Sequence, residues 1–418
     1  MVGRSEARGL AIVINDSPLS PWLANILGLL AFRRMDLEAV HFDTGRLLRP
    51  GSAEGRNRDE ADIDLQRLLE LLVAPRPKYI FSSHDLSVVQ LRPIREALKR
   101  NRVPWCRVVL GVIPGQVPPK GLRQRLSVFW FNVQRLSRKE NPLSVAAEVM
   151  RKLFARLMRR LGLHRTDYPP AYLLLEGKAA AAAVSEPGAT IIPGHSRDYE
   201  TALSGGLLGR HGSEDFCVFL DANEPGACDW PVLGFARRDV VDEKWYLAAL
   251  LKSFKVIEEA TGLRVIVLAH PRYAYPPGRF GNHEVRTGET MEMVSRARLV
   301  LAHYSTAVSF AVIFNKPVVL LTAKPFDDLA AGWIGRYVAN FQRALGCITL
   351  SMDEPDAGAL RDWARIDKTR YAEYRDCYIK YPGSPDRSMW ETATRVIAKA
   401  EGWQMTDAAA SAEALSHE

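Results

Sequence analysis

The chain has 418 residues, of which 47% are hydrophobic and 25% are charged. This length exceeds what one hydrophobic core usually fills, so we expect two domains of about 200 residues each. The ordinary composition excludes a fibrous protein and a wholly disordered one. The five cysteines have neither Cys-x-x-Cys spacing nor a histidine at metal-ligand spacing, which argues against a structural metal site and against a disulfide framework.

The first half of the sequence alternates between short apolar runs typical of strands and segments with helical spacing of apolar residues. The expected strands span residues 10–15, 37–42, 79–82, 105–112 and 190–192, and the expected helices span 23–32, 63–72 and 88–100. Such alternation predicts a parallel sheet with helices on both faces.

One segment carries the excess of positive charge. Residues 121–165 contain eleven lysines and arginines against two acidic residues, Glu140 and Glu148, in a chain of net charge +8. Apolar residues alternate with arginine at helical spacing on either side of Pro142, so we expect a basic helical hairpin inserted in the first domain. Its basic face is either a solvated face that covers the domain or a surface for an anionic membrane, where each Lys or Arg contributes about 1 kcal/mol. No base-reading motif accompanies the charge, so no nucleic-acid partner is expected.

Glycine and polar residues cluster at about 204–214, where we place the linker between the domains. The strand and helix alternation then repeats, with expected strands at 216–220, 264–269, 299–302 and 317–322 and expected helices at 245–260, 291–297 and 306–314. We therefore expect two α/β lobes with a cleft between them, at residues 1–204 and 214–400, and a disordered tail at 404–418. No run of about 18 apolar residues occurs, so we expect a cytoplasmic protein.

Polar side chains follow three expected strands of the second lobe. Asp221 comes directly after the first strand, with Asp229 just beyond, and a carboxylate placed there faces a ligand or caps the next turn. His270 and Arg272, on either side of Pro271, offer donors for a phosphate or a carboxylate.

The third loop leads into a helix at Ser305 and Thr306, which either cap that helix or bind an anion at its positive end. Glu289, before the preceding helix, offers an acceptor for ribose hydroxyls. Each signal is weak by itself, and their order and spacing together indicate a site that binds a nucleotide.

That order, followed by Lys316-Pro317-Val318, resembles the GT-B-type transferases of bacterial capsule and O-antigen assembly, most closely the retaining Kdo transferases and related surface-carbohydrate proteins. The resemblance covers residues 168–323 and is densest at 265–322. It implies two Rossmann-like lobes: an N-terminal acceptor-side domain with the basic helical insertion and a C-terminal domain that binds the nucleotide sugar.

The resemblance also implies roles for individual residues. His270, Pro271, Ser305 and Thr306 would hold the CMP phosphate, Glu289 the ribose, and Arg272 the phosphate or the sugar carboxylate. Asp221 would be the nucleophile of a retaining reaction. The chain departs from the family pattern at residues 223–228, so the division of labour between Asp221 and Asp229 stays open. The polar loop at 194–199 recurs in the group, which makes His195, Ser196 and Asp198 additional site candidates.

The function implied is transfer of an acidic sugar, Kdo or a relative, from a CMP-activated donor to a surface polysaccharide or glycolipid. No metal and no other cofactor are expected, and the location implied is cytoplasmic, at the inner face of the inner membrane. Three alternatives stay open: an inverting CMP- or UDP-sugar transferase that uses Asp221 or Asp229 as general base, a nucleotide-sugar epimerase, and a non-enzymatic scaffold at the membrane surface.

Overall fold

The computed structural model describes residues 9–16, 19, 23–24, 27–48, 63–115, 167–184, 186–209, 212–226, 241–270, 273, 275–328 and 333–404. The chain divides into two compact units: unit 1 contains Met1–Gly111, Arg165–Ser204 and Lys380–Glu418, and unit 2 contains Val112–His164 and Gly205–Ile379. The expected basic hairpin at 121–165, Asp229, Pro271, Arg272 and the tail beyond residue 404 lie outside the described residues.

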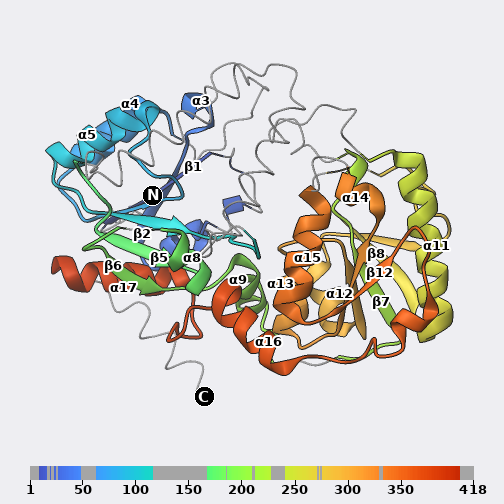
Figure 1. Ribbon diagram of the computed structural model, residues 1–418. Helices are drawn as coiled ribbons and strands as arrows, with labels where there is room; N and C mark the ends of the chain where they lie inside the picture. Colours follow the sequence, from blue (N-terminus) through green and yellow to red (C-terminus); the bar gives the residue numbers. More distant parts are fainter. Residues whose placement is uncertain are drawn as a thin grey trace, which may run out of the picture. The chain divides into compact units, whose positions relative to one another are not determined.

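Unit 1 is built on a six-stranded parallel sheet in the order β2-β1-β3-β4-β5-β6 (Figure 1). The strands are β1 (Gly9–Asn15), β2 (Leu37–Asp43), β3 (Lys78–Ser82), β4 (Trp105–Val109), β5 (Tyr172–Leu175) and β6 (Thr190–Pro193). The strands are mostly buried, and β1 and β5 are nearly all apolar, as a sheet covered on both faces requires. Of these strands, only β5 was not expected from the sequence.

Helices cover both faces of this sheet. Alternate strand residues such as Ala11 and Val13 pack with α2 (Leu29–Arg34) and α17 (Met389–Glu401). The residues between them, such as Ile12, pack against the other face, which is covered by helices α4 (Leu65–Val73) and α5 (Arg92–Arg100). The remaining helical segments are α3 (Gly45–Leu48), η1 (Val89–Leu91), α8 (Lys178–Ala183) and α9 (Arg197–Ser204). The two-residue alternation of buried side chains thus supplies two cores from one sheet.

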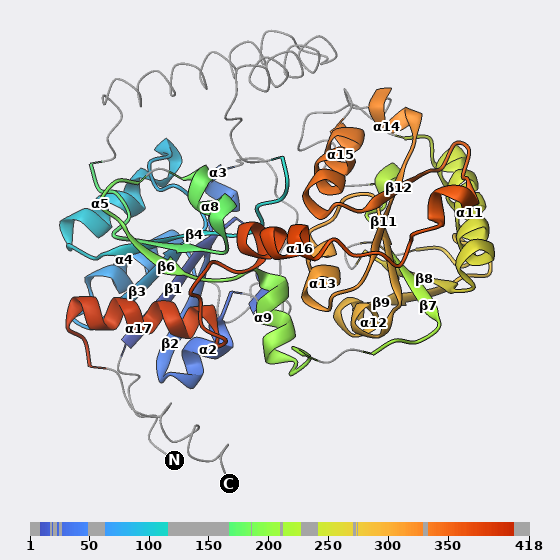
Figure 2. The ribbon, with the colours of Figure 1, turned by 60° about the horizontal axis from the view of Figure 1, so that its bottom comes forward.

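The C-terminal segment of the chain belongs to unit 1, although we expected residues up to 400 in the second lobe. The physical reason is the burial of Trp390, which is 1% exposed and packs edge-on against Phe32 and Phe81, with ring centroids 5.8 and 5.5 Å away. Figure 2 shows helix α17, which carries this side chain, beside strands β1, β2 and β3. Without α17 the part of this face around Phe32 and Phe81 would be exposed to water.

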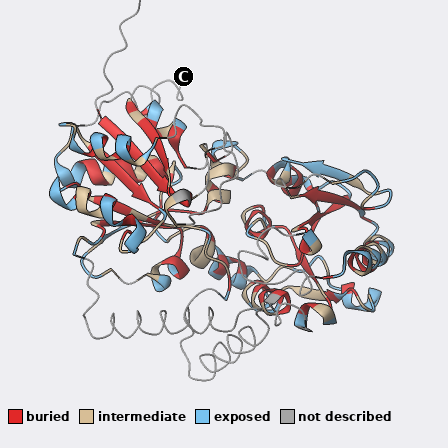
Figure 3. Cartoon of the chain, turned by 90° about the horizontal axis from the view of Figure 1, so that it is seen from above, coloured by how far each residue is buried: buried red, intermediate tan, exposed pale blue. Residues whose placement is uncertain are grey.

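Unit 2 has a second six-stranded parallel sheet, in the order β12-β11-β10-β7-β8-β9. Its strands are β7 (Phe216–Leu220), β8 (Arg264–Ala269), β9 (Glu284–Thr287), β10 (Leu299–Ala302), β11 (Val318–Thr322) and β12 (Ile348–Ser351). The helices are α11 (Glu243–Thr261), α12 (Thr290–Arg296), α13 (Val308–Ile313), α14 (Lys324–Asp328), α15 (Trp333–Leu345) and α16 (Lys368–Tyr374), with shorter turns at η2 (Glu224–Gly226), η5 (Ala357–Leu360) and η6 (Arg375–Ile379). The central strands are buried and the helices keep exposed outer faces (Figure 3).

Local signals define the longest helix of unit 2. Helix α11 begins after Asp242, whose carboxylate accepts a hydrogen bond from the backbone N–H of Trp245 at 2.7 Å. It ends at Gly262, which has a φ of 69°, a conformation that favours glycine. The expected fold class, two Rossmann-like α/β lobes, is confirmed by the two sheets. Among the described residues, no helix combines the length and the apolar character needed to cross a membrane.

We predict that Gly28→Ala destabilises unit 1 more than Gly111→Ala does. Both glycines have nearly the same positive φ, 74° and 78°, so both variants lose about 1–2 kcal/mol from backbone strain. A methyl group on Gly28 would in addition overlap the Trp390 ring, whereas nothing lies within 4 Å of one on Gly111. Urea unfolding should therefore show a further loss of about 1–3 kcal/mol for Gly28→Ala. Equal losses would contradict the described packing of Trp390.

Candidate functional site

The strand order of unit 2 places a binding edge at the centre of its sheet. Strands β7 and β10 are neighbours, and the chain continues from β7 to β8 and β9 on one side and from β10 to β11 and β12 on the other. Numbered within the unit, this is the order 3-2-1-4-5-6, in which ligands bind outside the carboxyl ends of the strands where the order reverses. Asp221 follows β7 and His303 follows β10, so both lie at this point.

Asp221 is held by three hydrogen bonds and is only 6% exposed. Its backbone N–H donates to the Leu268 carbonyl at 3.1 Å, which fixes it to the end of β8. One carboxylate oxygen accepts from the backbone N–H of Asn223 at 3.1 Å, and the other accepts from the Tyr275 hydroxyl at 2.5 Å. Burial raises the pKa of Asp221, while these hydrogen bonds and the charge of Arg279 act in the opposite direction.

Glu224 is a second carboxyl group at the same edge, and it is fully buried. Burial and the nearby charge of Asp221 raise the pKa of Glu224 to about 8. The Asp221 anion is stabilised by its hydrogen bonds, so we assign the negative charge to Asp221 and the proton to Glu224 at neutral pH. The pair thus offers one carboxylate and one carboxylic acid.

Arg279 joins this cluster from the segment between β8 and β9. Its guanidinium donates to the Asn223 side-chain oxygen at 2.9 Å and pairs with Glu243 at the start of α11. It also lies over the Tyr275 ring, 5.3 Å from the ring centroid. A cation in this position offsets the negative charge of Asp221 and packs on the Tyr275 ring.

His303 is buried and neutral. Its Nδ1 lies 2.8 Å from the Leu321 carbonyl, and its Nε2 lies 2.9 Å from the Tyr246 hydroxyl. Burial lowers the pKa of His303 to about 4. A neutral imidazole can donate through one nitrogen only, so Nδ1 donates to the carbonyl and Nε2 accepts from Tyr246. His303 therefore ties α11 to β10 and β11 beneath the edge.

Four other residues expected in the site are described. The His270 backbone N–H donates to the Tyr275 hydroxyl at 3.4 Å, so the β8 loop and Asp221 share one partner. Ser305 accepts a hydrogen bond from the Ala307 N–H at 3.2 Å, which closes a local turn before α13, and Thr306 is exposed. Helix α13 begins later than expected, after Ala307, and has no side-chain cap. Glu289 is exposed before α12 and lies 3.9 Å from Arg286. All four follow strands at the carboxyl edge, and the network of bonds to Asp221 reaches His270.

The additional candidates from the polar loop at 194–199 belong to unit 1. His195 is fully buried; its Nε2 lies 2.5 Å from Glu200 and its Nδ1 lies 3.4 Å from Ser384. Ser196 accepts from the Tyr199 N–H at 3.2 Å and so caps α9, and Asp198 lies in the first turn of that helix. Burial acts to raise the pKa of Glu200, but hydrogen bonds, foremost that with His195, outweigh it and keep this pKa low. His195 thus connects α9 to the C-terminal segment.

Sequence reasoning missed Glu224, Tyr275, Arg279 and the pair of Tyr246 with His303 as members of the cluster. Glu224, Tyr275 and His303 stand in the three loops that the sequence singled out, whereas Arg279 and Tyr246 carry no local signal. Within the described ranges, no group of three or more His, Cys, Asp or Glu side chains is placed to hold a metal ion.

We predict that Glu224→Gln changes the pH dependence of stability. The folded protein keeps the Glu224 proton up to a pH of about 8, whereas the unfolded chain releases it near 4.5. Wild-type stability therefore falls as pH rises between these values, by up to about 1.4 kcal/mol per pH unit, and the variant lacks this loss. Urea unfolding from pH 5 to 8 measures the difference. Glu292→Gln, at an exposed position, is the control; a Glu224→Gln curve parallel to wild type would contradict the assigned proton.

We predict that His195→Ala lowers stability and leaves nucleotide binding unchanged. The variant leaves the half-buried Glu200 carboxylate without its imidazole partner, although the Met389 N–H still donates to it, so we expect a loss of about 1–3 kcal/mol. His84→Ala removes a half-buried histidine of the same unit, 3.8 Å from Asp16, and should cost less. Thermal unfolding and calorimetric titration with nucleotides measure the two effects. Loss of nucleotide affinity at unchanged stability would contradict this prediction and would assign His195 to the nucleotide-binding site.

No family model and no curated protein matches the sequence. Several solved structures resemble it at low identity. They include the glycotransferase of kitacinnamycin (13% identity over 94% of this chain and 99% of that chain, TM-score 0.45) and the Methanocaldococcus jannaschii UDP-GlcNAc 2-epimerase in complex with UDP-GlcNAc and UDP (11%, 94% and 99%, 0.42). A third is the wall teichoic acid polymerase TagF (10%, 95% and 90%, 0.45). At these values the function has to be argued from the residues of this chain.

Proposed function

We propose that the protein is a glycosyltransferase that moves an acidic sugar from a CMP-activated donor to a surface polysaccharide or glycolipid. The observation that carries the proposal is the position of Asp221. It is a carboxylate at the point of unit 2 where the strand order reverses, close enough to Glu224 and Arg279 for electrostatic interaction with both. A buried charge costs folding free energy, and such groups cluster at binding and catalytic sites.

The nucleotide would bind along the carboxyl edge. In the proposal, His270 and Ser305, which follow β8 and β10, meet the phosphate together with Pro271 and Thr306, and Glu289 meets the ribose. Arg272 meets the phosphate or the carboxylate of the sugar, because guanidinium groups bind both in a bidentate manner. Attachment to an anionic membrane through residues 121–165 belongs to the same proposal.

For a retaining reaction, an Asp221 oxygen forms a bond to the anomeric carbon while the bond to the CMP phosphate breaks and CMP leaves with the electron pair. The acceptor hydroxyl then attacks from the opposite face, loses its proton and releases Asp221. Tyr275 and the Asn223 N–H each bind one oxygen of Asp221, so the orientation of the attacking carboxylate is fixed. Asp229 would share this work, either as the base for the acceptor hydroxyl or, in an inverting reaction, as the alternative base to Asp221.

A nucleotide-sugar epimerase is the second candidate. The pair of Asp221 and Glu224 favours it, because an epimerase needs a base and an acid at one centre, and this pair supplies one of each. Product analysis separates the two, since an epimerase acts without an acceptor.

We predict that CMP binds selectively among CMP, CDP, UMP and UDP, and that His270→Ala weakens this binding about tenfold, the loss of one charge-assisted hydrogen bond. Calorimetric titration of the full chain measures it. His283→Ala removes another half-buried histidine of unit 2, before β9, and should bind CMP as wild type does. Preference for UDP would favour a UDP-sugar transferase or an epimerase, and no binding of any nucleotide would favour the scaffold.

We predict that Asp221→Asn lowers transfer from CMP-Kdo by on the order of 10³-fold or more, with CMP affinity kept, because the amide cannot attack the anomeric carbon. Radiolabel transfer to a glycolipid acceptor measures activity, and intact mass of the wild type measures a covalent sugar adduct. Activity should persist with a chelator present. An active Asp221→Asn variant would move the nucleophile to Asp229 or refute the retaining reaction.

A further inference from the structure

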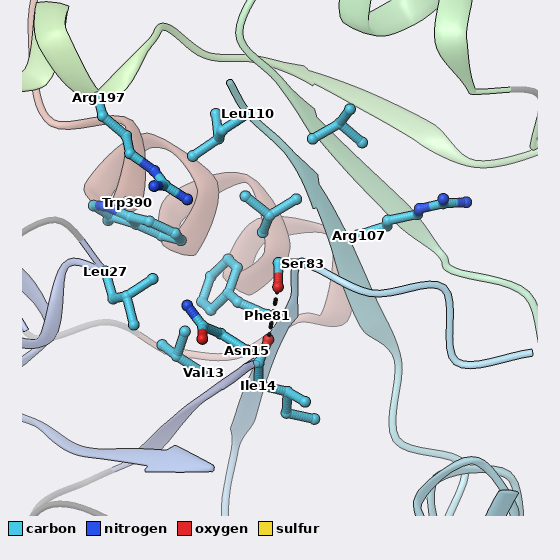
Figure 4. Close-up of a pocket in the computed structure, with 12 residues that line it drawn as sticks. Val13, Ile14, Asn15, Leu27, Phe81, Ser83, Arg107, Leu110, Arg197 and Trp390 are labelled. Atoms are coloured by element: carbon cyan, nitrogen blue, oxygen red, sulfur yellow. Dashed lines mark hydrogen bonds between the residues drawn. The ribbon is translucent and has the colours of Figure 1, made fainter. Parts of the chain in front are cut away.

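Unit 1 contains a pocket that none of the roles above uses. It lies at the carboxyl ends of β1, β3 and β4 and has a volume of about 140 Å³. Its lining, drawn in Figure 4, includes Asn15, Ser83, Arg107, Arg197, Phe81 and Trp390. This volume is below the roughly 300–1,000 Å³ of sites for larger ligands, so the pocket suits a single ring or a smaller group.

The strand order makes this pocket a binding position. In the unit 1 sheet, β2 lies on one side of β1, and β3 and the later strands lie on the other. The order therefore reverses between β1 and β3, and ligands bind outside the carboxyl ends of strands at such a point. Asn15 ends β1 and Ser83 directly follows β3, so the pocket opens at this reversal.

The pocket has an unbalanced positive charge. Two arginines line it, and the Arg107 side chain extends away from the pocket (Figure 4) to pair with Glu186 at 3.0 Å and Asp85 at 3.6 Å. The Arg197 guanidinium has no ion pair or hydrogen bond with any described residue, and its Nε is buried without a partner there. None of the described lining residues is acidic. A guanidinium that is partly buried and has no acidic neighbour is suited to bind the anionic group of a ligand.

The wall of the pocket beside Arg197 is apolar, and its indole is held in place by neighbouring rings. Figure 4 shows the Arg197 guanidinium pointing toward the indole of Trp390, with Leu27 and Phe81 nearby. The indole is fixed by its contacts with Phe32 and Phe81, so it presents a constant surface to a ligand. A flat apolar wall beside a cation matches a ring that has one apolar face and carries an anionic group.

We propose that this pocket binds the oxyanion of a small ring compound, with the anion on Arg197 and the apolar face of the ring on Trp390. The oxyanion is the carboxylate of a sugar acid or the phosphate of a sugar phosphate. The anion site stands on the geometry of unit 1 alone, and the identification of the ring as a sugar rests on the proposed function. Such a site would favour acceptors that carry an acidic sugar unit.

The test is calorimetric titration of the full chain with glucuronate, glucose 6-phosphate and glucose. We expect one of the two anions to bind, glucose to bind at least tenfold more weakly, and Arg197→Gln to weaken the anion at least tenfold. Arg197→Lys keeps the charge and should have an intermediate effect. Arg395→Gln, on the exposed side of α17 and paired with Glu391, is the matched control and should leave binding unchanged. Melting temperatures confirm that each variant is folded.

The two anion titrations identify the source of the oxyanion. Preference for glucuronate indicates a sugar acid, and preference for glucose 6-phosphate indicates a phosphorylated sugar. Absence of binding by both anions, binding that does not depend on Arg197, or equal binding of glucose would overturn the proposal. CMP is titrated in the same samples. Loss of CMP binding with anion binding kept would contradict the proposed function alone, and CMP that displaces the anion would contradict a separate pocket.

Discussion

In both sheets every strand runs parallel to its neighbours, so all carboxyl ends of a sheet open on one edge and both faces must be covered by helices. Polar side chains that take part in chemistry can then gather only at that edge. In unit 2 the residues that follow β7, β8 and β10 bring Asp221, His270 and His303 there. In unit 1 the same rule produces the pocket beside Arg197. The two sheets are both fully parallel, but the edge of unit 2 carries the carboxylate of Asp221 and the edge of unit 1 carries the guanidinium of Arg197.

The two edges differ in how their charges are satisfied. In unit 2 the charge of Asp221 is compensated within the chain, by Tyr275, by a backbone N–H and by the nearby Arg279, and the neighbouring Glu224 keeps its proton. In unit 1 the guanidinium of Arg197 has no such compensation among the described residues. The first arrangement prepares a reactive group, and the second leaves a charge for a ligand to neutralise.

The sequence predicts the buried strands well, because runs such as β1, β7 and β10 are apolar on both faces and leave no competing interpretation. It does not predict β9, which has three polar residues of four and is largely exposed at the sheet edge. It also does not predict β12, a short strand at the other edge of that sheet, nor β5, a short run after two prolines. Asp221 was predicted because it follows an apolar run directly. Arg279 and Tyr246 were not, because their contacts with the site join residues more than 50 positions apart, and no local pattern records such contacts.

The return of α17 to unit 1 has a consequence for how the chain matures during synthesis. Unit 2 is formed largely from one continuous stretch, Gly205–Ile379, whereas the core of unit 1 includes Met389, Trp390 and Ile397. A nascent chain can therefore bury the strands of unit 2 while the sheet of unit 1 still exposes the face around Phe32 and Phe81. The usual order, in which N-terminal parts mature first, is reversed. The helix that completes the core of unit 1 is therefore synthesised after the continuous stretch that forms most of unit 2.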